Sequence, residues 1–260
     1  MKTFRMIGTA LLAVLVCVNF TSCSEDDDLT EYPGKNEYGL PTNIANNTII
    51  YKTSDNVIIR FNNEDVFSGA KIIDNYYSTT KGYGTIIFNR EVAAIEEDAF
   101  NSYRLGSGFN LKGNLTAIVM PASVASIGHG AFGSCESLTN VTIPNSVTSI
   151  GDFAFEDCSG LTSIEIPNSV TSIEDYAFQF CYSLTNVTIG NNVTSIGKCA
   201  FRECHNLTSI YLKAITPPIT KSEVFRSVNL SNVTLYVPKG TLETYKNSSC
   251  WKNFENIQEL

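Results

Sequence analysis

A period of 23 residues is the feature of this sequence that most constrains its fold. Segments that begin at Leu115, Leu138, Leu161 and Leu184 share the pattern L-T-x-[IV]-x-[IM]-P-x-[SN]-V-x-S-I-x-x-x-A-F-x-x-C, with Gly190 in place of the proline in the fourth copy. A fixed period of this length predicts a solenoid, in which each repeat buries its apolar face against its neighbours. Such a fold offers a broad, regular surface rather than one deep pocket, so the period favours binding over catalysis.

The order of residues within one repeat predicts the path of one coil. Leu161, Ile164 and Ile166 have the L-x-x-L-x-L spacing of a leucine-rich repeat strand. Side chains alternate along a strand, so Ile164 and Ile166 point inward while Ser163 and Glu165 point outward. Pro167 has no N–H to donate and ends the strand. The remaining apolar positions turn the chain back into the core and then fill its far side on a short helical turn: Val170, Ile173, Ala177, Phe178 and Cys181.

The motif S-V-T-S-I at 146–150 and 169–173, followed by A-F-x-x-C, resembles the consensus of the BspA-like leucine-rich repeat family, also called the Treponema pallidum type. The resemblance covers roughly residues 85–260. It implies a β-rich solenoid of 23-residue units with short strands and short helical turns. It also implies a surface lipoprotein of Bacteroidetes that attaches to host matrix proteins or to other bacteria and is not an enzyme.

Both ends of the array depart from the repeat and should form caps, because a terminal repeat would otherwise expose its core and its strand edge. Residues 48–53 and 57–61 read as two strands of a β-hairpin. The expected segments, in order, are a signal peptide (1–22), an acidic flexible tether (23–47), a β cap (48–84), leucine-rich repeats (85–213) with an insertion (101–114), and a repeat remnant with an irregular cap (214–260).

The N-terminus has the pattern of a secretory signal, with Lys2 and Arg5 before an apolar run at 6–20. This run is shorter than the roughly 20 residues of a transmembrane helix. Residues 20–23 (F-T-S-C) resemble a bacterial lipobox, although Phe20 stands where leucine is usual. The resemblance implies cleavage before Cys23 and acylation of Cys23; ordinary secretion with an incidental thiol is the alternative.

The acidic run at 24–28 resembles the surface-export signal of Bacteroidetes lipoproteins, and its alternative reading is a solvated spacer. We therefore expect an outer-membrane protein that is lipid-anchored and exposed at the cell surface. The formal charge of −8 becomes −10 once Lys2 and Arg5 are removed with the signal. This acidity argues against a nucleic-acid partner and restricts membrane contact to the lipid anchor.

The sequence offers no catalytic, cofactor or metal site. It has two histidines without evident partners and lacks the G-x-S-x-G, H-E-x-x-H and phosphate-loop motifs. Cysteines at 135, 158, 181 and 204 recur with the repeat, and thiols in a straight line cannot surround zinc tetrahedrally. We expect a buried column of small apolar thiols there, with Cys199 and Cys250 as the candidates for a disulfide or a free thiol.

Two surfaces are candidate partner sites. Outward strand positions should stack into rows of small, mostly polar side chains, which begin at Ala117 and Val119 and continue through Asn140, Thr142, Ser163, Glu165, Asn186, Thr188, Ser209 and Tyr211. The insertion carries residue types that anchor protein interfaces: Tyr103, Arg104 and Phe109. Each set has a plain alternative, as a solvated sheet face and as packing over the solenoid edge.

The leading hypothesis is a surface lipoprotein that binds a protein partner, either a host matrix protein or a bacterial surface protein. A carbohydrate-binding accessory protein of a surface nutrient system is the first alternative, and it would need aromatic side chains lined up for a glycan. A structural spacer without a ligand is the second alternative.

Overall fold

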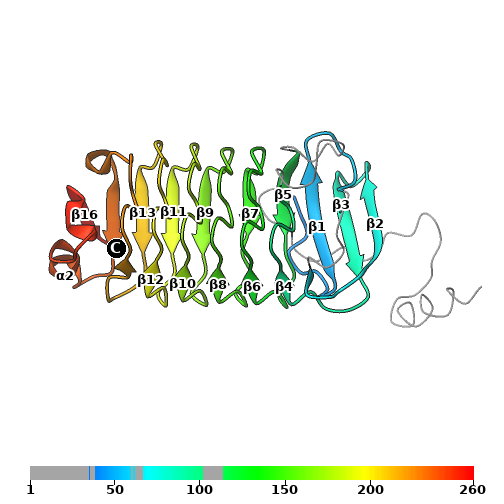
Figure 1. Ribbon diagram of the computed structural model, residues 1–260, viewed down its shortest axis with the longest axis horizontal. Coiled ribbons are helices and arrows are strands. Elements are labelled where there is room, and N and C mark those ends of the chain that lie inside the picture. Colours follow the sequence, from blue (N-terminus) through cyan, green and yellow to red (C-terminus); the bar gives the residue numbers. More distant parts are fainter. Residues whose placement is uncertain (1–34, 36–38, 60, 62–66, 102–113) are drawn as a thin grey trace, which may run out of the picture.

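The protein is an elongated stack of coils with a cap at each end (Figure 1). The computed structural model describes residues 35, 39–59, 61, 67–101 and 114–260. Successive coils advance along the long axis of the molecule at the 23-residue spacing of the sequence repeat. The predicted β-rich solenoid is therefore confirmed.

One side of the solenoid is built from parallel strands, one from each coil. The register joins equivalent positions of successive repeats, so that Asn186 lies between Ser163 and Ser209. Strand β9 ends at Ile166, directly before Pro167, as the sequence predicted. The strands are β5 (Leu115–Val119), β7 (Asn140–Thr142), β9 (Ser163–Ile166), β11 (Asn186–Ile189), β13 (Ser209–Leu212), β15 (Thr234–Val237) and β16 (Asn256–Glu259).

A second side carries a parallel sheet of two-residue strands, which the sequence analysis did not predict. Each S-I pair of the repeat forms one strand, and its isoleucine is buried. Two residues are too few to show an alternating pattern, so the strand is defined only by its neighbours in the stack. These strands are β4 (Ala94–Ile95), β6 (Ser126–Ile127), β8 (Ser149–Ile150), β10 (Ser172–Ile173), β12 (Ser195–Ile196) and β14 (Ile219–Thr220).

The third side consists of short i→i+3 turns, such as Glu156 N–H to the Phe153 carbonyl at 3.0 Å, rather than of a regular helix. The backbone N–H groups of Phe153, Phe155 and Asp157 donate to carbonyls of the next coil at 3.0, 2.8 and 2.8 Å. Phe153 and Asp157 have φ of 57° and 53°. This left-handed conformation breaks an α-helix and directs alternate N–H groups along the stack rather than along the coil.

Threonine side chains reinforce the stack where the strands begin. The hydroxyl of Thr185 donates to the Thr162 carbonyl at 2.9 Å, and that of Thr171 donates to the Thr148 carbonyl at 3.2 Å. Both bonds join equivalent positions of adjacent coils. They give the threonines of the L-T and V-T steps a structural role, since each hydroxyl bonds to the neighbouring coil.

A column of stacked phenylalanine rings runs through the centre of the solenoid. Neighbouring ring centroids are 5.0 to 5.7 Å apart and the ring planes differ by 12° or less. Offset parallel rings at this separation attract one another in addition to burying apolar surface. The members of the column are Phe100, Phe132, Phe155, Phe178, Phe201 and Phe225, and all are buried.

Edge-to-face aromatic contacts end this column at both caps. At the N-terminal end, Phe67 packs edge-on to Phe100 at 5.9 Å. At the C-terminal end, Trp251 and Phe254 pack edge-on to Phe225 at 5.8 and 5.3 Å. The caps therefore cover the terminal rings with side chains that do not repeat.

The N-terminal cap is a sheet in which β1 (Thr48–Thr53) lies between β3 (Tyr83–Phe88) and β5, antiparallel to both. The outer strand is β2 (Ile72–Ser78). The predicted hairpin is wrong, because Val57–Ile59 form no strand and β1 pairs with residues distant in sequence. The sequence of 48–53 was enough to predict a strand there. It was not enough to predict the partner strands, β3 and β5, which lie far along the chain.

Residues 39–47, expected in the tether, pack against the outside of this sheet. Leu40 and Ile44 bury the outward side chains Ala117 and Val119 of β5. These two residues, which begin the predicted outward rows, are therefore buried. The exposed strand surface starts at β7.

The C-terminal cap contains the short helix α2 (Leu242–Lys246) and the 3-10 turns η2 (Leu230–Asn232) and η3 (Trp251–Asn253). The Tyr245 hydroxyl donates to the Ala214 carbonyl at 2.6 Å, and the Trp251 indole donates to the Pro218 carbonyl at 3.0 Å. These bonds satisfy the polar atoms of two buried aromatic side chains and fix the cap to the last coil.

We predict that Phe155→Ala lowers the free energy of unfolding by about 3–5 kcal/mol, because it removes a fully buried ring from the middle of the column. Phe153→Ala on the same coil, where the ring is only half-buried, should cost about 1 kcal/mol. Urea unfolding followed by circular dichroism measures both values. Equal losses for the two variants would contradict a stabilising role of the buried column.

Candidate functional site

The outward residues of the repeat strands form a continuous surface, here called the strand face. The register places its side chains in two rows, as predicted, with Thr188 between Glu165 and Tyr211. Glu165 and Asn186 are exposed, and Thr188 and Ser209 are half-buried. Small hydroxyl and amide groups dominate the rows, so this face is polar and flat over three successive strands.

Two tyrosines stand at the C-terminal end of the strand face. The ring centroids of Tyr211 and Tyr236 are 4.6 Å apart with planes only 4° from parallel. Because β13 and β15 are neighbouring strands, the rings stack along the solenoid axis and turn their edges outward. A glycan platform needs an open ring face on the surface, and each of these rings has one face covered by the other. Sequence analysis found Tyr211 but not its partner Tyr236.

The predicted lipidation site and loop lie outside the described residues. These are Cys23, Tyr103, Arg104 and Phe109. Their assignments stay predictions.

The repeated cysteines form a buried column, as predicted, and hydrogen-bond in a way that the sequence did not reveal. The thiol of Cys158 donates to the Phe132 carbonyl at 3.2 Å, and Cys181 and Cys204 do the same to the coils before them. Burial raises the pKa of Cys158 and Cys181 well above the usual value and that of Cys204 to about 12. The thiols are therefore protonated and unreactive at neutral pH.

Cys199 and Cys250 are also free thiols in this structure. Within the described ranges, no group of three or more histidine, cysteine, aspartate or glutamate side chains is arranged to hold a metal ion.

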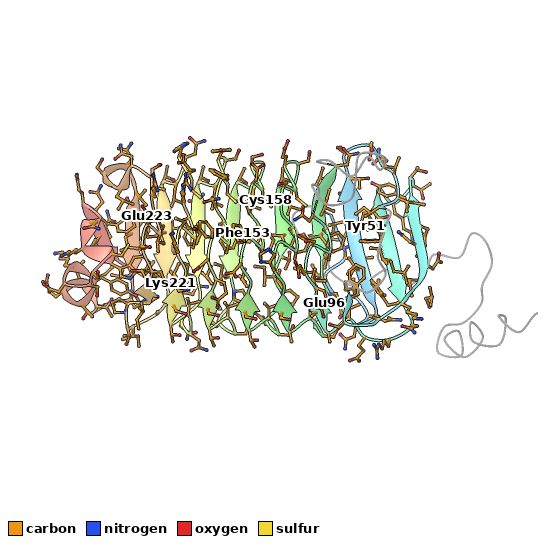
Figure 2. The ribbon with its side chains drawn as sticks, in the orientation of Figure 1. Tyr51, Glu96, Phe153, Cys158, Lys221 and Glu223 are labelled. Carbon is orange, nitrogen blue, oxygen red and sulfur yellow. The ribbon has the colours of Figure 1, made fainter. Side chains whose placement is uncertain are left out.

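The most varied surface of the molecule is on the third side of the coils. We call the outward residues of segments 96–101, 128–136, 151–159, 174–182, 197–205 and 221–229 the turn face. Phe153 lies in the middle of this surface along the stack (Figure 2) and stacks on Tyr176 at 4.7 Å. Phe180 and Tyr182 follow on the same coil as Tyr176, and none of these four rings is buried.

Cations of the next coil already contact these rings. The ammonium of Lys198 is 5.9 Å from the ring centroid of Tyr176, and the guanidinium of Arg202 is 5.5 Å from that of Phe180. Both separations are within the range of cation–π attraction. The turn face thus presents aromatic rings in positions that accept cationic groups.

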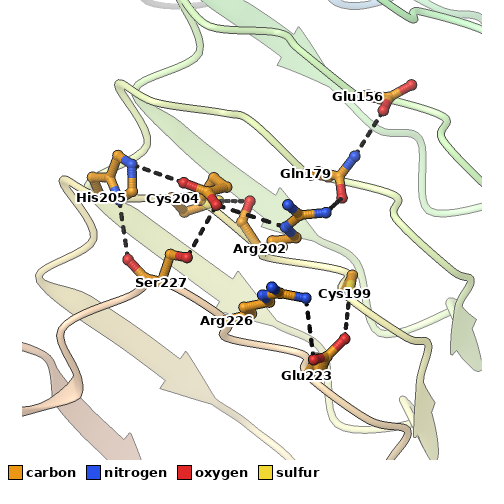
Figure 3. Close-up of polar contacts among 10 residues, drawn as sticks. Glu156, Gln179, Cys199, Arg202, Cys204, His205, Glu223, Arg226 and Ser227 are labelled. Atoms are coloured by element: carbon orange, nitrogen blue, oxygen red, sulfur yellow. Dashed lines mark hydrogen bonds and ion pairs between the residues drawn. The ribbon is translucent and has the colours of Figure 1, made fainter.

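A chain of polar contacts fixes the side chains of the turn face across four coils (Figure 3). The Gln179 amide donates to Glu156 at 2.8 Å and accepts from Arg202 at 3.4 Å. Glu203 then joins the network through His205 at 3.0 Å and through the Ser227 hydroxyl at 3.0 Å. These contacts hold long side chains in place before any partner arrives, which lowers the entropy cost of binding.

Charge is distributed unevenly along the turn face. Its four segments between 96 and 182 contain nine aspartates and glutamates and neither lysine nor arginine. Its last two segments contain four cations, Lys198, Arg202, Lys221 and Arg226, and two glutamates. Glu96 and Lys221 accordingly lie toward opposite ends of the stack (Figure 2).

The carboxylates in the middle of the turn face are partly buried. Burial raises the pKa of Glu156, and burial together with the nearby Glu136 raises that of Asp157. Sequence reasoning missed this surface because its members occupy the variable positions of the repeat, where only the recurrence of aromatic residues in neighbouring copies gave a signal.

Family comparison agrees with this architecture. The model for the BspA type leucine rich repeat region matches residues 106–231 and 181–260, in six copies. The chain belongs to this family. Leucine-rich repeat solenoids of the family are generally non-catalytic and mediate protein–protein interaction. No curated protein matches the chain.

Several solved structures are similar to this chain. A leucine-rich repeat protein of T. pallidum is 27% identical, with a TM-score of 0.47, over 57% of this chain and 64% of its own. A leucine rich cell surface protein of Faecalibacterium prausnitzii is 26% identical, with a TM-score of 0.47, over 83% and 54%. A leucine-rich repeat protein of Bacteroides ovatus is 24% identical, with a TM-score of 0.39, over 56% and 43%. The chain spans less than two thirds of the length of each.

Among the described residues, no helix has both the length and the apolar character needed to cross a bilayer.

Proposed function

We propose that the protein is a cell-surface lipoprotein whose leucine-rich repeats bind a protein partner without catalysis. The observation that carries this proposal is the contrast between the interior and the exterior of the coils. Inside, six coils repeat the same phenylalanine and four of them the same thiol, and these thiols are buried. Outside, two continuous faces present fixed polar, charged and aromatic side chains, which are the groups that protein interfaces use.

The proposed location rests on the sequence of the N-terminus. A signal at 1–22 followed by Cys23 and an acidic run supports a lipid anchor at the outer membrane with exposure at the surface. Several acyl chains on one cysteine give a stable anchor, at about 0.8 kcal/mol per buried CH₂. The membrane then contacts only the lipid, and the coils remain available to host matrix or bacterial surface proteins.

Carbohydrate binding is the second candidate function, because Tyr211 and Tyr236 form an aromatic pair on the strand face. We place it behind protein binding because the two rings cover one another and turn their edges outward. We place a spacer role without a ligand last, because in a spacer the side-chain network of the turn face would contribute only to stability.

Cys23→Ala should abolish incorporation of radiolabelled palmitate and move the full-length protein from the membrane to the soluble fraction. Cys17→Ala is the matched control, because Cys17 lies inside the proposed signal and should leave labelling unchanged. Protease treatment of intact cells should remove the wild-type protein. Labelling of the Cys23 variant, or protection from protease, would contradict the anchor or the surface location, respectively.

Soluble residues 24–260 should bind saturably to at least one protein in a panel of host matrix and bacterial surface proteins, measured by biolayer interferometry beside a glycan panel. Two variants locate the site: Tyr103→Ala, Arg104→Ala and Phe109→Ala together in the insertion, and Asn140→Ala, Glu165→Ala and Asn186→Ala together on the strand face. A loss of tenfold or more in one variant would assign binding to that surface. Binding to glycans alone would contradict the proposal, and so would silence on both panels.

A further inference from the structure

The aromatic residues of the turn face occupy backbone positions that do not suit them. Phe153, Tyr176 and Phe180 have φ of 57°, 60° and 63°. Glycine, asparagine and aspartate adopt this left-handed conformation most readily, whereas bulky residues there are outliers. Gly130 holds the position equivalent to Phe153 one coil earlier, with φ of 57°. The coil can therefore form without an aromatic ring, and folding alone does not explain these residues.

The left-handed backbone recurs at equivalent positions of the next coil, Cys199 and Glu203, so the surrounding structure holds it and only the choice of aromatic rings there calls for an explanation. Three inter-coil bonds per turn hold this backbone, such as Phe180 N–H to the Arg202 carbonyl at 2.9 Å. The rings remain half-exposed despite this ordering. Rigid, partly exposed aromatic side chains lose little entropy on binding and are enriched where binding energy concentrates.

The chemistry around the rings specifies the kind of group that would contact them. Lys198 and Arg202 lie against Tyr176 and Phe180 from the C-terminal side. On the N-terminal side the neighbouring coils contribute Glu136 and Asp157, and segments 128–136 and 151–159 contain neither lysine nor arginine. Burial, together with the nearby charge of Glu136, raises the pKa of Asp157. On the C-terminal side the rings thus contact cations of the same molecule. On the N-terminal side carboxylates are in excess.

We propose that the turn face between residues 128 and 182 docks a lysine- and arginine-rich segment of a protein partner. Cationic side chains of the segment contact the carboxylates Glu136 and Asp157, and its apolar atoms contact Phe153, Tyr176 and Phe180. Opposite charges speed and orient encounter, while the rings supply contact area. This inference rests on the proposed protein-binding function and adds the surface and the chemistry of the partner.

A second copy of the chain fits this face less well. In a two-fold dimer the same patch would face itself. Segments 128–136, 151–159 and 174–182, which form the proposed patch, contain six aspartates and glutamates and neither lysine nor arginine, so self-pairing would bring like charges together. Charge complementarity therefore selects a cationic partner.

The test uses residues 24–260 and a fluorescein-labelled twelve-residue peptide of alternating arginine and leucine, with a glutamate–leucine peptide as the control probe. Fluorescence anisotropy at physiological salt should show saturable binding of the arginine peptide only. Tyr176→Asn with Phe180→Asn keeps the net charge and suits the backbone, and should weaken binding at least fivefold. Glu136→Gln with Asp157→Asn should weaken it at least tenfold.

A charge-matched pair off this face, Glu165→Gln with Glu243→Gln, should change the affinity less than twofold; both carboxylates are exposed. Thermal unfolding checks that every variant is folded. The proposal fails if the arginine peptide does not bind, if the aromatic variant binds normally, or if the off-face pair weakens binding as much as the turn-face pair. It also fails if the wild type sediments as a dimer that the aromatic variant abolishes.

The panel of protein ligands separates this failure from failure of the proposed function. A matrix or bacterial protein that binds the wild type and both turn-face variants equally would preserve protein binding and overturn the cationic docking surface. A protein that binds the wild type and loses affinity in both variants would support both.

Discussion

Stacking of one coil on the next is the interaction on which the rest of the structure depends. A single 23-residue coil cannot bury its own apolar face, and the ring of Phe155 is stacked between those of Phe132 and Phe178. The same neighbours accept the backbone N–H groups of the turn and the hydroxyls of the threonines. Apolar burial and hydrogen bonding therefore act along the same axis, which is why the sequence repeats at one fixed period.

The stack also explains how the surface is free to vary. The residue types at interior positions are restricted, because a change in the size of one ring or thiol disturbs its packing against the coils on both sides. Outward positions contact solvent and their lateral neighbours only. On the strand face the outward positions hold small polar residues. On the turn face they hold aromatic and charged residues, even where the backbone is left-handed. This variation within a regular repeat is the basis on which we propose the turn face as a binding surface.

Much of this architecture could be predicted from the sequence because it follows from local rules. The period predicted the solenoid, alternation predicted the inward Ile164 and Ile166, and Pro167 predicted the strand end. What could not be predicted depends on neighbours in space. The S-I strands exist only as members of a stack, and β1 pairs with strands far away along the chain. The left-handed residues within the short turns could not be predicted, because their N–H groups donate to carbonyls of the next coil, which no single repeat reveals.

The candidate site also has one part that could be predicted from the sequence and one part that could not. The rows of the strand face followed from the period and the alternation, except that residues 39–47 cover their first members. The turn face depended on knowing that Phe153, Tyr176 and Phe180 point outward although Phe155 and Phe178, two residues away, point inward. Phe153, Tyr176 and Phe180 themselves have the left-handed backbone conformation, and a sequence pattern does not show backbone handedness.

The most direct test of this account is whether the stack unfolds as one unit. The chain has a single tryptophan, Trp251, in the C-terminal cap against the last ring of the column, so its fluorescence reports that end alone. Far-ultraviolet circular dichroism reports strands throughout the molecule. In urea the two signals should change with the same midpoint, because an unbroken aromatic column joins the caps. A Trp251 transition well separated from the loss of circular dichroism would show that the coils do not act as one core and would contradict the account.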